Sequence, residues 1–136
     1  MALPPEPGKR GLRILLVEDN EDSRITLRKL LEMQGHVVED AGEGSSGVTK
    51  ALTWKPDVAL IDIGLPGLDG FEVARAVRSA AAGARLHLIA LTGYGDPGDR
   101  RRALEAGFDA HLVKPVRLEA LTRLLAAARN SGPCTP

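Results

Sequence analysis

The sequence predicts an α/β protein built on a parallel β-sheet. Two observations support this prediction: short apolar runs alternate five times with segments of helical periodicity, and four of those runs are apolar at almost every position. Alternating strands and helices form parallel sheets through right-handed crossovers, and strands covered by helices on both faces are apolar throughout. The 136 residues are enough for one domain with a hydrophobic core and too few for two.

The strands are expected at five short runs rich in Leu, Ile, Val and Ala. In chain order they are residues 12–17, 36–40, 57–61, 86–91 and 109–113. The second run, from His36 to Asp40, is more polar than the other four. We therefore expect it at an edge of the sheet, where it is less completely covered.

A helix is expected after each strand. In chain order the helices are residues 21–34, 45–54, 70–80, 97–106 and 117–129. The last has the clearest periodicity, because Leu118, Leu121 and Leu125 recur at helical spacing. Gly35 and Gly107 follow the first and fourth helices, where a left-handed stop favours a residue without a Cβ.

The predicted domain covers residues 12–129. Tails rich in Pro and Gly flank it at residues 1–11 and 130–136 and are typical of linkers. The N-terminal tail contains no apolar run like that of a signal peptide, and the single cysteine, Cys134, has no partner for a disulfide. A cytoplasmic location is expected.

The composition argues against several classes of partner. The net charge is zero, with 18 basic and 18 acidic residues, so the overall charge does not favour nucleic acid or an anionic membrane. One Trp, one Tyr and two Phe are too few for a surface that stacks bases. The apolar runs are far shorter than the roughly 20 residues that span a bilayer.

Reactive polar side chains stand at the carboxyl ends of four expected strands. Glu18 and Asp19 follow the first strand, Asp62 the third, Thr92 the fourth and Lys114 the fifth. In open α/β sheets ligands bind at this edge, where the strand order reverses. Three carboxylates, a hydroxyl and an ammonium are therefore expected to converge.

This set of groups suits the transfer of a phosphoryl group. Three carboxylates oppose one another's ionisation unless a cation joins them, and Mg²⁺ prefers oxygen ligands and often bridges carboxylates to a phosphate. The Lys114 ammonium and the Thr92 hydroxyl can stabilise phosphoryl oxygens. The Asp62 carboxylate can itself be the nucleophile, which gives an aspartyl phosphate.

Each residue also has a purely structural interpretation. Asp19 or Asn20 is suited to cap the first helix, Asp62 precedes a turn-forming segment, and Lys114 precedes a proline at a bend. Their common position at successive strand ends favours the functional interpretation.

Five segments in the correct order resemble the receiver domain of two-component response regulators. The resemblance covers about residues 12–129, and the segments that carry it read Ile14-Leu15-Leu16-Val17-Glu18-Asp19-Asn20, Asp62-Ile63-Gly64-Leu65-Pro66, Gly67-Leu68-Asp69-Gly70, Leu91-Thr92-Gly93 and Gly107-Phe108-Asp109-Ala110-His111-Leu112-Val113-Lys114-Pro115. The resemblance implies a flavodoxin-like, doubly wound sheet of five parallel strands in the order 2-1-3-4-5 with five flanking helices.

The resemblance also implies roles for the site residues. Asp62 would accept a phosphoryl group from a histidine kinase or a histidine phosphotransfer protein. Mg²⁺ would be held by Glu18, Asp19, Asp62 and the Gly64 carbonyl, while Thr92 and Lys114 would contact the phosphoryl oxygens. The Lys114–Pro115 peptide bond would be cis, which costs little before proline.

Two positions depart from the commonest family pattern. His111 stands three residues before Lys114, where the family often has Tyr or Phe that moves inward with the threonine on phosphorylation. Either His111 acts as this switch residue, together with Thr92 and Pro115, or it is a half-exposed strand residue. Gly64 and Tyr94 occupy positions that tune the phosphate lifetime in the family, and they do not predict that lifetime here.

Two enzymatic alternatives are weaker. Residues 42–47 match the dinucleotide-binding pattern G-x-G-x-x-G, but Glu43 would lie beside a pyrophosphate and a second nucleotide-binding half is missing. No nucleotide cofactor is therefore expected. A haloacid-dehalogenase-like phosphatase needs a second Asp two residues after its nucleophile, where this chain has Gly64. A zinc site is not expected, since the three histidines lie on separate strands.

The basic run Arg100-Arg101-Arg102 lies on the fourth expected helix. It is either a solvated helix face or part of a partner surface formed by the fourth helix, the fifth strand and the fifth helix, as in many receivers. No helix-turn-helix for DNA is evident.

The expected function is a phosphorylation switch, in which added charge and acceptors at Asp62 draw in Thr92 and shift the following loop. The chain is either a stand-alone regulator or the receiver of a hybrid sensor histidine kinase, and residues 62–66 and 91–95 resemble the second more closely. The cognate kinase, the signal and the oligomeric state are not predicted.

Overall fold

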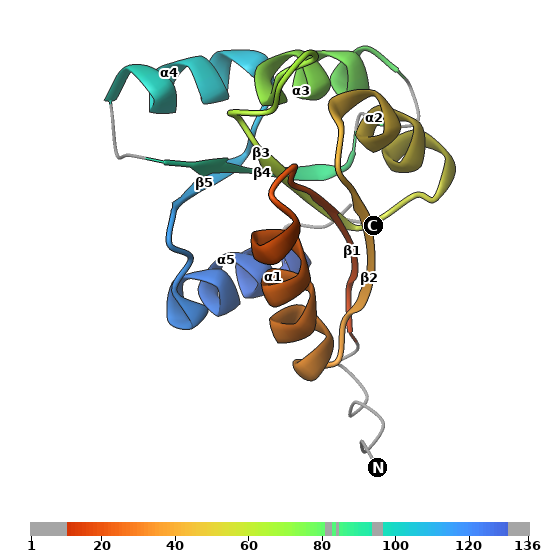
Figure 1. Ribbon diagram of the computed structural model, residues 1–136, viewed down its shortest axis with the longest axis vertical. Helices are drawn as coiled ribbons and strands as arrows, with labels where there is room; N and C mark the ends of the chain where they lie inside the picture. Colours follow the sequence, from red (N-terminus) through yellow and green to blue (C-terminus); the bar gives the residue numbers. More distant parts are fainter. Residues whose placement is uncertain (1–10, 81–82, 84, 94–96, 131–136) are drawn as a thin grey trace.

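A computed structural model of the chain describes residues 11–80, 83, 85–93 and 97–130 (Figure 1). Strands and helices alternate without exception along the described chain. The strands are β1 (Arg13–Val17), β2 (Val37–Ala41), β3 (Val58–Asp62), β4 (His87–Thr92) and β5 (Ala110–Val113). The helices are α1 (Glu21–Met33), α2 (Gly44–Thr53), α3 (Gly70–Ser79), α4 (Pro97–Ala106) and α5 (Leu118–Asn130).

All five strands join one parallel sheet in the order β2-β1-β3-β4-β5. The predicted order and helix count are confirmed, and the more polar β2 lies at an edge as expected. The chain runs from β1 to β2 on one side and then crosses to β3 on the other. Between β1 and β3 the sheet therefore has a topological switch point, the place where ligands bind in such folds.

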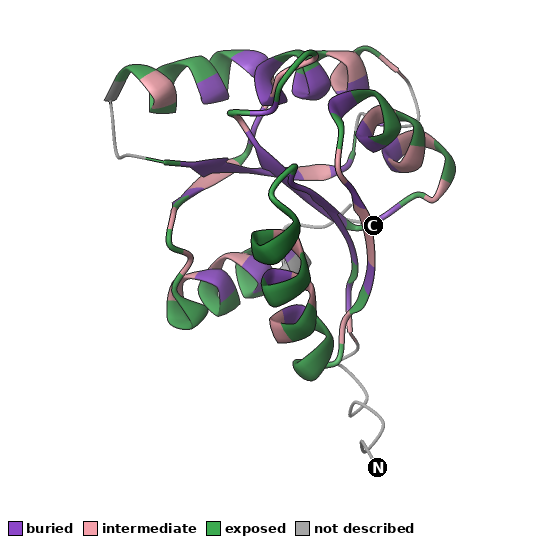
Figure 2. Cartoon of the chain, viewed as in Figure 1, coloured by how far each residue is buried: buried purple, intermediate pink, exposed green. Residues whose placement is uncertain are grey.

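The helices cover the sheet in two layers (Figure 1). Successive side chains of a strand point to opposite faces, so Leu15 and Val17 of β1 pack toward α2, α3 and α4. Ile14 and Leu16 pack toward α1 and α5. These two hydrophobic clusters bury the central strands except at the first residues of β1 and β4 (Figure 2), which explains why their sequences are apolar at nearly every position.

Every strand begins one residue later than predicted, and at three starts the physical reason is visible. The Asp57 side chain accepts a hydrogen bond from Arg13 N, the first amide of β1, at 2.8 Å. The Asp109 side chain accepts one from Leu88 N, the second amide of β4, at 2.8 Å. His36 Nδ1 accepts from Leu12 N at 2.9 Å. These side chains thus complete the amino edge of the sheet, and the strands that follow them start at the next residue.

The helix ends follow local rules. Asn20, rather than Asp19, caps α1, because its side chain accepts from Ser23 N at 2.9 Å. Gly35 and Gly107 follow α1 and α4 with φ of 92° and 110°, the left-handed conformation predicted for them. The Lys114–Pro115 bond is cis, as the family resemblance implied.

The predicted tails fall almost wholly outside the described residues, although Asn130 belongs to α5. Within the described part of the chain, no helix combines the length and the apolar character needed to cross a bilayer.

Candidate functional site

The strand ends carry the predicted side chains to one edge of the sheet. The ladder continues one residue past three strands: Glu18 N donates to Ala41 O at 3.0 Å, Ile63 N to Leu91 O at 3.1 Å and Lys114 N to Thr92 O at 2.7 Å. These bonds hold the backbone where the polar residues begin. The side chains that follow therefore start from a rigid platform.

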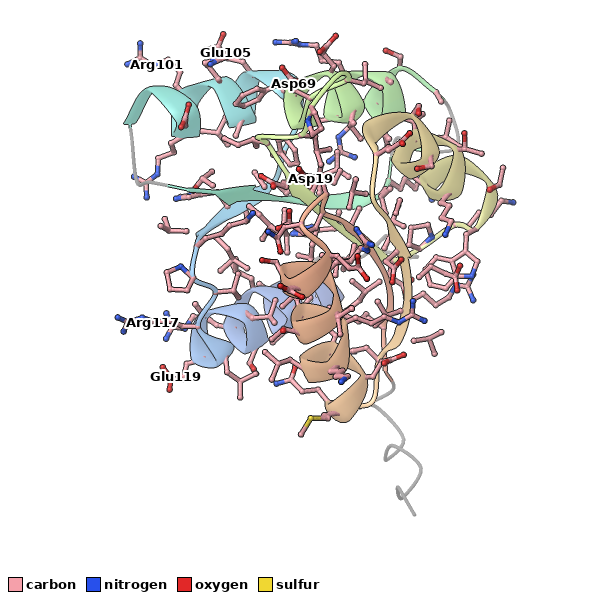
Figure 3. All side chains as sticks on the ribbon, viewed as in Figure 1. Asp19, Asp69, Arg101, Glu105, Arg117 and Glu119 are labelled. Carbon is pink, nitrogen blue, oxygen red and sulfur yellow. The ribbon has the colours of Figure 1, made fainter. Side chains whose placement is uncertain are left out.

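The three carboxylates meet at this edge. One oxygen each from Glu18, Asp19 and Asp62 lie within 4.8 Å of one another. Glu18 is only 2% exposed and Asp62 8%, whereas Asp19 is exposed in the loop between β1 and α1 (Figure 3). The predicted convergence of carboxylates is confirmed.

Lys114 bridges the two buried carboxylates. Its Nζ donates to Glu18 Oε1 at 2.6 Å and to Asp62 Oδ2 at 3.0 Å. Burial opposes the charge on the ammonium, but these two carboxylates outweigh it and raise the pKa of Lys114. The lysine is therefore a permanent cation between an acid that follows β1 and the acid that ends β3.

The two buried acids differ in their electrostatics. Burial raises the pKa of Glu18, and the neighbouring Asp62 raises it further, against the opposing hydrogen bond from Lys114. Burial also opposes ionisation of Asp62, yet hydrogen bonds from Gly64 N and Lys114 outweigh it and lower the pKa of Asp62. Asp62 is thus the carboxylate that stays ionised, the form a nucleophile requires.

The carboxylates fit a magnesium ion. Ligands at about 2.1 Å from Mg²⁺ lie about 3 Å apart when adjacent and about 4.2 Å apart when opposite, so these oxygens need to approach by about 2 Å at most. All are hard oxygen donors, and the single Lys114 ammonium leaves an excess of negative charge that a cation can neutralise. Among the described residues this is the one group of three or more His, Cys, Asp or Glu arranged to hold a metal. Its three ligand-bearing side chains are all carboxylates.

Gly64 and Thr92 are close to this centre but make different contacts from those implied by the resemblance. Gly64 N donates to Asp62 Oδ1 at 2.9 Å, and the metal-binding role of its carbonyl stays a prediction. Thr92 is buried, and its hydroxyl donates to the Leu112 carbonyl of β5 at 3.4 Å. To reach a phosphoryl group on Asp62 it has to leave this long hydrogen bond.

His111 lies on β5 opposite Ala90 and next to α4. Arg100 Nε donates to its Nε2 at 3.4 Å. Burial lowers the pKa of His111 and the positive charge of Arg100 lowers it further, so the ring is neutral at physiological pH. A neutral, half-buried ring is compatible with the predicted switch role, which stays a prediction. Tyr94 lies outside the described residues.

The basic run on α4 does not form a single patch. Arg100 contacts His111, Arg101 points away from the helix into solvent (Figure 3), and Arg102 lies over the Phe71 ring with its guanidinium 4.4 Å from the ring centroid. Successive helix positions differ by about 100°, since there are 3.6 residues per turn. The run therefore links α4 to both β5 and α3.

The glycines of the G-x-G-x-x-G pattern have a packing role. A Cβ on Gly44 would lie 2.2 Å from the Leu68 carbonyl oxygen, and one on Gly47 would lie 2.9 Å from Val17 Cγ2. These glycines allow α2 to approach β1 and the loop before α3.

Two features of the site were not predicted from the sequence. A cavity of about 550 Å³ opens beside Glu18 and Lys114, with Leu27, Leu30 and Pro115 in its lining. Arg24 on α1 donates from NH1 to the Glu18 carbonyl at 2.8 Å. In the sequence Arg24 is simply a basic residue one helical turn after Asn20, and this position alone does not predict its contact with Glu18.

Comparison with known proteins agrees with this geometry. The family model of the response regulator receiver domain matches residues 14–126. A gliding motility regulatory protein of Myxococcus xanthus is 42% identical over 108 residues, which is 79% of this chain and 14% of that protein. The transcriptional regulatory protein AfsQ1 of Streptomyces coelicolor is 37% identical over 119 residues, 88% of this chain and 52% of that protein. The chain thus spans about half or less of the length of these curated relatives.

Solved structures lead to the same family. The receiver domain of the sensor histidine kinase PA1611 from Pseudomonas aeruginosa, solved with a magnesium ion coordinated in its active site cleft, has a TM-score of 0.83 at 36% identity, covering 89% of this chain and 99% of that chain. The chemotaxis response regulator CheY4 of Vibrio cholerae has a TM-score of 0.81 at 28% identity, covering 87% and 98%. The chain therefore belongs to the family of response regulator receiver domains.

Proposed function

We propose that this chain is a phosphoacceptor switch: Asp62 takes a phosphoryl group from a phosphohistidine in a magnesium-dependent reaction. The observation that carries the proposal is the environment of Asp62. It is a carboxylate with a lowered pKa, placed between two further acids and bonded to Lys114 at 3.0 Å. The magnesium ion in the PA1611 receiver supports the same assignment.

In the proposed step an Asp62 carboxylate oxygen forms a bond to phosphorus. The bond between phosphorus and the donor imidazole nitrogen breaks, and its electron pair returns to that nitrogen, which leaves an acyl phosphate on Asp62. Magnesium, held by Glu18, Asp19, Asp62 and the Gly64 carbonyl, would supply Lewis-acid stabilisation of the phosphoryl oxygens. Lys114 supplies a fixed positive charge that needs no reorganisation during the step.

The switch follows from Thr92. A phosphoryl group on Asp62 carries a charge of roughly −1.5 to −2 and strong acceptor oxygens. The Thr92 hydroxyl exchanges its 3.4 Å bond to Leu112 for one of these acceptors. Because Thr92 ends β4, its movement displaces the connection to α4, and Arg100 and His111 respond. Such a change needs two packings that differ by only a few kcal/mol.

The signal leaves through the face formed by α4, β5 and α5. Leu104, Val113 and Leu118, one on each of these three elements, are 62%, 41% and 47% exposed, and exposed apolar side chains that gather on one surface are typical of a protein contact. The downstream partner binds on this face, and the phosphodonor is a histidine kinase or a histidine phosphotransfer protein. Since this donor chemistry depends on ATP, we place the protein in the cytoplasm.

Radiolabel transfer tests the proposal. A phosphohistidine donor or a small phosphodonor should label the chain in the presence of Mg²⁺, and chelation should stop labelling while the circular dichroism spectrum stays unchanged. The Asp62→Asn variant should take no label. Asp69→Asn is the matched control, because Asp69 lies in the same loop region and only caps α3, a task that Asn performs as well. Acid-stable labelling of the Asp62 variant would falsify the assignment.

A further inference from the structure

Arg24 occupies an unusual place between the acidic cluster and the edge of the sheet. It lies in the first turns of α1, where its NH1 donates to the Glu18 carbonyl at 2.8 Å. Its Nε lies 3.8 Å from Asp40 Oδ1 of β2. The guanidinium also packs over Gly42, where a Cβ would come within 3.0 Å of NH1. One side chain thus contacts the loop after β1, the end of β2 and the loop after β2.

We propose that Arg24 is a positioning residue for the magnesium site, because it holds the peptide that joins Glu18 to Asp19. The inference rests on the proposed function. This peptide sets the directions of two of the three carboxylates. The backbone of Glu18 is held on both sides: its amide donates to Ala41 O at 3.0 Å, and its carbonyl, which belongs to this peptide, accepts from Arg24.

The ion pair with Asp40 does not explain the position of Arg24. Asp40 has a closer partner in Arg28, whose NH1 lies 2.6 Å from its Oδ2. Arg28 stands one turn further along the same helix, where its guanidinium donates to Asp40 and Glu32. The two arginines therefore share a helix, a charge and an acidic neighbour, and only Arg24 contacts the Glu18 carbonyl.

Electrostatics and positioning predict opposite results when Arg24 is removed. As a cation near the site, Arg24 repels Mg²⁺, so loss of its charge alone would strengthen magnesium binding. As a positioning residue, it keeps two ligands in place, and loss of such an outer contact typically weakens metal affinity by about tenfold or more. The sign of the change therefore separates the two roles.

The test is a magnesium titration by isothermal calorimetry on Arg24→Met, Arg24→Lys and Arg28→Met, with thermal unfolding of each variant to establish that it is folded. Arg24→Met keeps the apolar stem and loses the donor. We expect its dissociation constant for Mg²⁺ to rise by about tenfold. Arg24→Lys keeps a donor and a charge and should stay within about threefold of the unchanged chain, since one charged hydrogen bond is preserved. The dissociation constant of Arg28→Met should stay within about twofold of that of the unchanged chain. Arg28 does not contact the backbone or side chains of the acidic cluster, and residues without shared contacts couple weakly.

Each other outcome overturns the inference. Equal or tighter binding by Arg24→Met would leave only the charge effect, and an equal loss in Arg28→Met would assign the effect to the ion pairs with Asp40. Equal losses in Arg24→Met and Arg24→Lys would point to packing. If the unchanged chain binds no Mg²⁺, the proposed function fails as well; if it binds and Arg24→Met matches it, only the role of Arg24 fails.

Discussion

At the scale of single residues, the site depends on an imbalance of charge. Three carboxylates face one ammonium, and burial together with the neighbouring Asp62 raises the pKa of Glu18. A buried charge without full compensation is unfavourable. A bound divalent cation would remove this cost, because the Glu18 carboxylate would coordinate the ion and its charge would be neutralised.

The raised pKa of Glu18 predicts that magnesium binding weakens in acid. A proton on Glu18 competes with the ion, so affinity is full above the raised pKa and is lost as the pH falls through it. For one released proton the loss approaches about tenfold per pH unit. Calorimetry between pH 8 and pH 5 measures this slope. The lowered pKa of Asp62 keeps that acid from contributing until lower pH.

The Glu18→Gln variant is the control for this pH dependence. It should bind Mg²⁺ more weakly than the unchanged chain and with a flatter dependence on pH, since the competing proton is gone. A slope as steep as that of the unchanged chain would show that another group titrates.

Lys114 is expected to separate metal binding from switching. In Lys114→Met the ammonium that repels Mg²⁺ is absent, so magnesium affinity should hold or rise. The buried acids lose a charged hydrogen bond, and the metal-free protein should lose about 1.5–3 kcal/mol of unfolding free energy. Because Lys114 has a raised pKa, its contribution is present at neutral pH and is lost only as the pH rises through that pKa.

Urea unfolding with and without Mg²⁺ measures both effects of Lys114, and amide chemical shifts of α4 after phosphorylation measure switching. We expect the α4 shifts to be much smaller in Lys114→Met than in the unchanged chain. A full response of α4 would exclude Lys114 from the switch.

At the scale of helices and strands, the site is set by where strands stop. The amino edge of the sheet is completed by Asp57, Asp109 and His36, and the carboxyl edge carries the reactive groups. Close contacts between elements then determine how the loops lie. Gly44 is the clearest case, since it brings α2 against the Leu68 carbonyl in the loop between Asp62 and α3.

A methyl group at Gly44 should therefore be costly. In Gly44→Ala the new Cβ would meet the Leu68 carbonyl at 2.2 Å and Val73 Cγ2 at 3.0 Å. Overpacking of this kind costs about 1–3 kcal/mol, more than the helix propensity that alanine gains. The midpoint of urea unfolding should fall accordingly. Gly93→Ala is the matched control, because a Cβ there meets nothing within 4 Å, and its unfolding free energy should change by less than about 0.5 kcal/mol.

At the scale of the whole molecule, two hydrophobic clusters hold the sheet between its helix layers and leave the acids at the switch point. The buried acids are anchored to the neighbouring strands β1 and β3, whose residues are all buried apart from Arg13 at the start of β1. A ligand that joins these acids should therefore stabilise the entire fold, because unfolding has to release it.

Magnesium should raise the melting temperature, and the shift should grow with the ratio of its concentration to its dissociation constant. At a concentration about 100 times its dissociation constant it should add about 2.7 kcal/mol to the unfolding free energy, which is a shift of several degrees for a domain of this size. Scanning calorimetry at constant ionic strength measures the shift. Asp62→Asn removes a ligand and should abolish most of it, and an equal shift in that variant would place the ion elsewhere.

The element order, the edge position of β2 and the set of residues at the strand ends could be predicted from the sequence. Hydrophobic periodicity and caps are local properties, and parallel strands bring their ends together by geometry alone. The family motifs then gave the strand order and the cis bond before proline, and both are present.

The tertiary structure alone decided how these residues interact. It showed that Asn20 rather than Asp19 caps α1, that Thr92 bonds to β5, and that the glycine pattern at residues 42–47 serves packing. It also revealed the contact of Arg24 with Glu18. Such contacts join residues on different elements, and burial and orientation of a side chain depend on the packing of its neighbours. Spacing along one chain does not encode them directly, whereas it does encode the periodicity of each element.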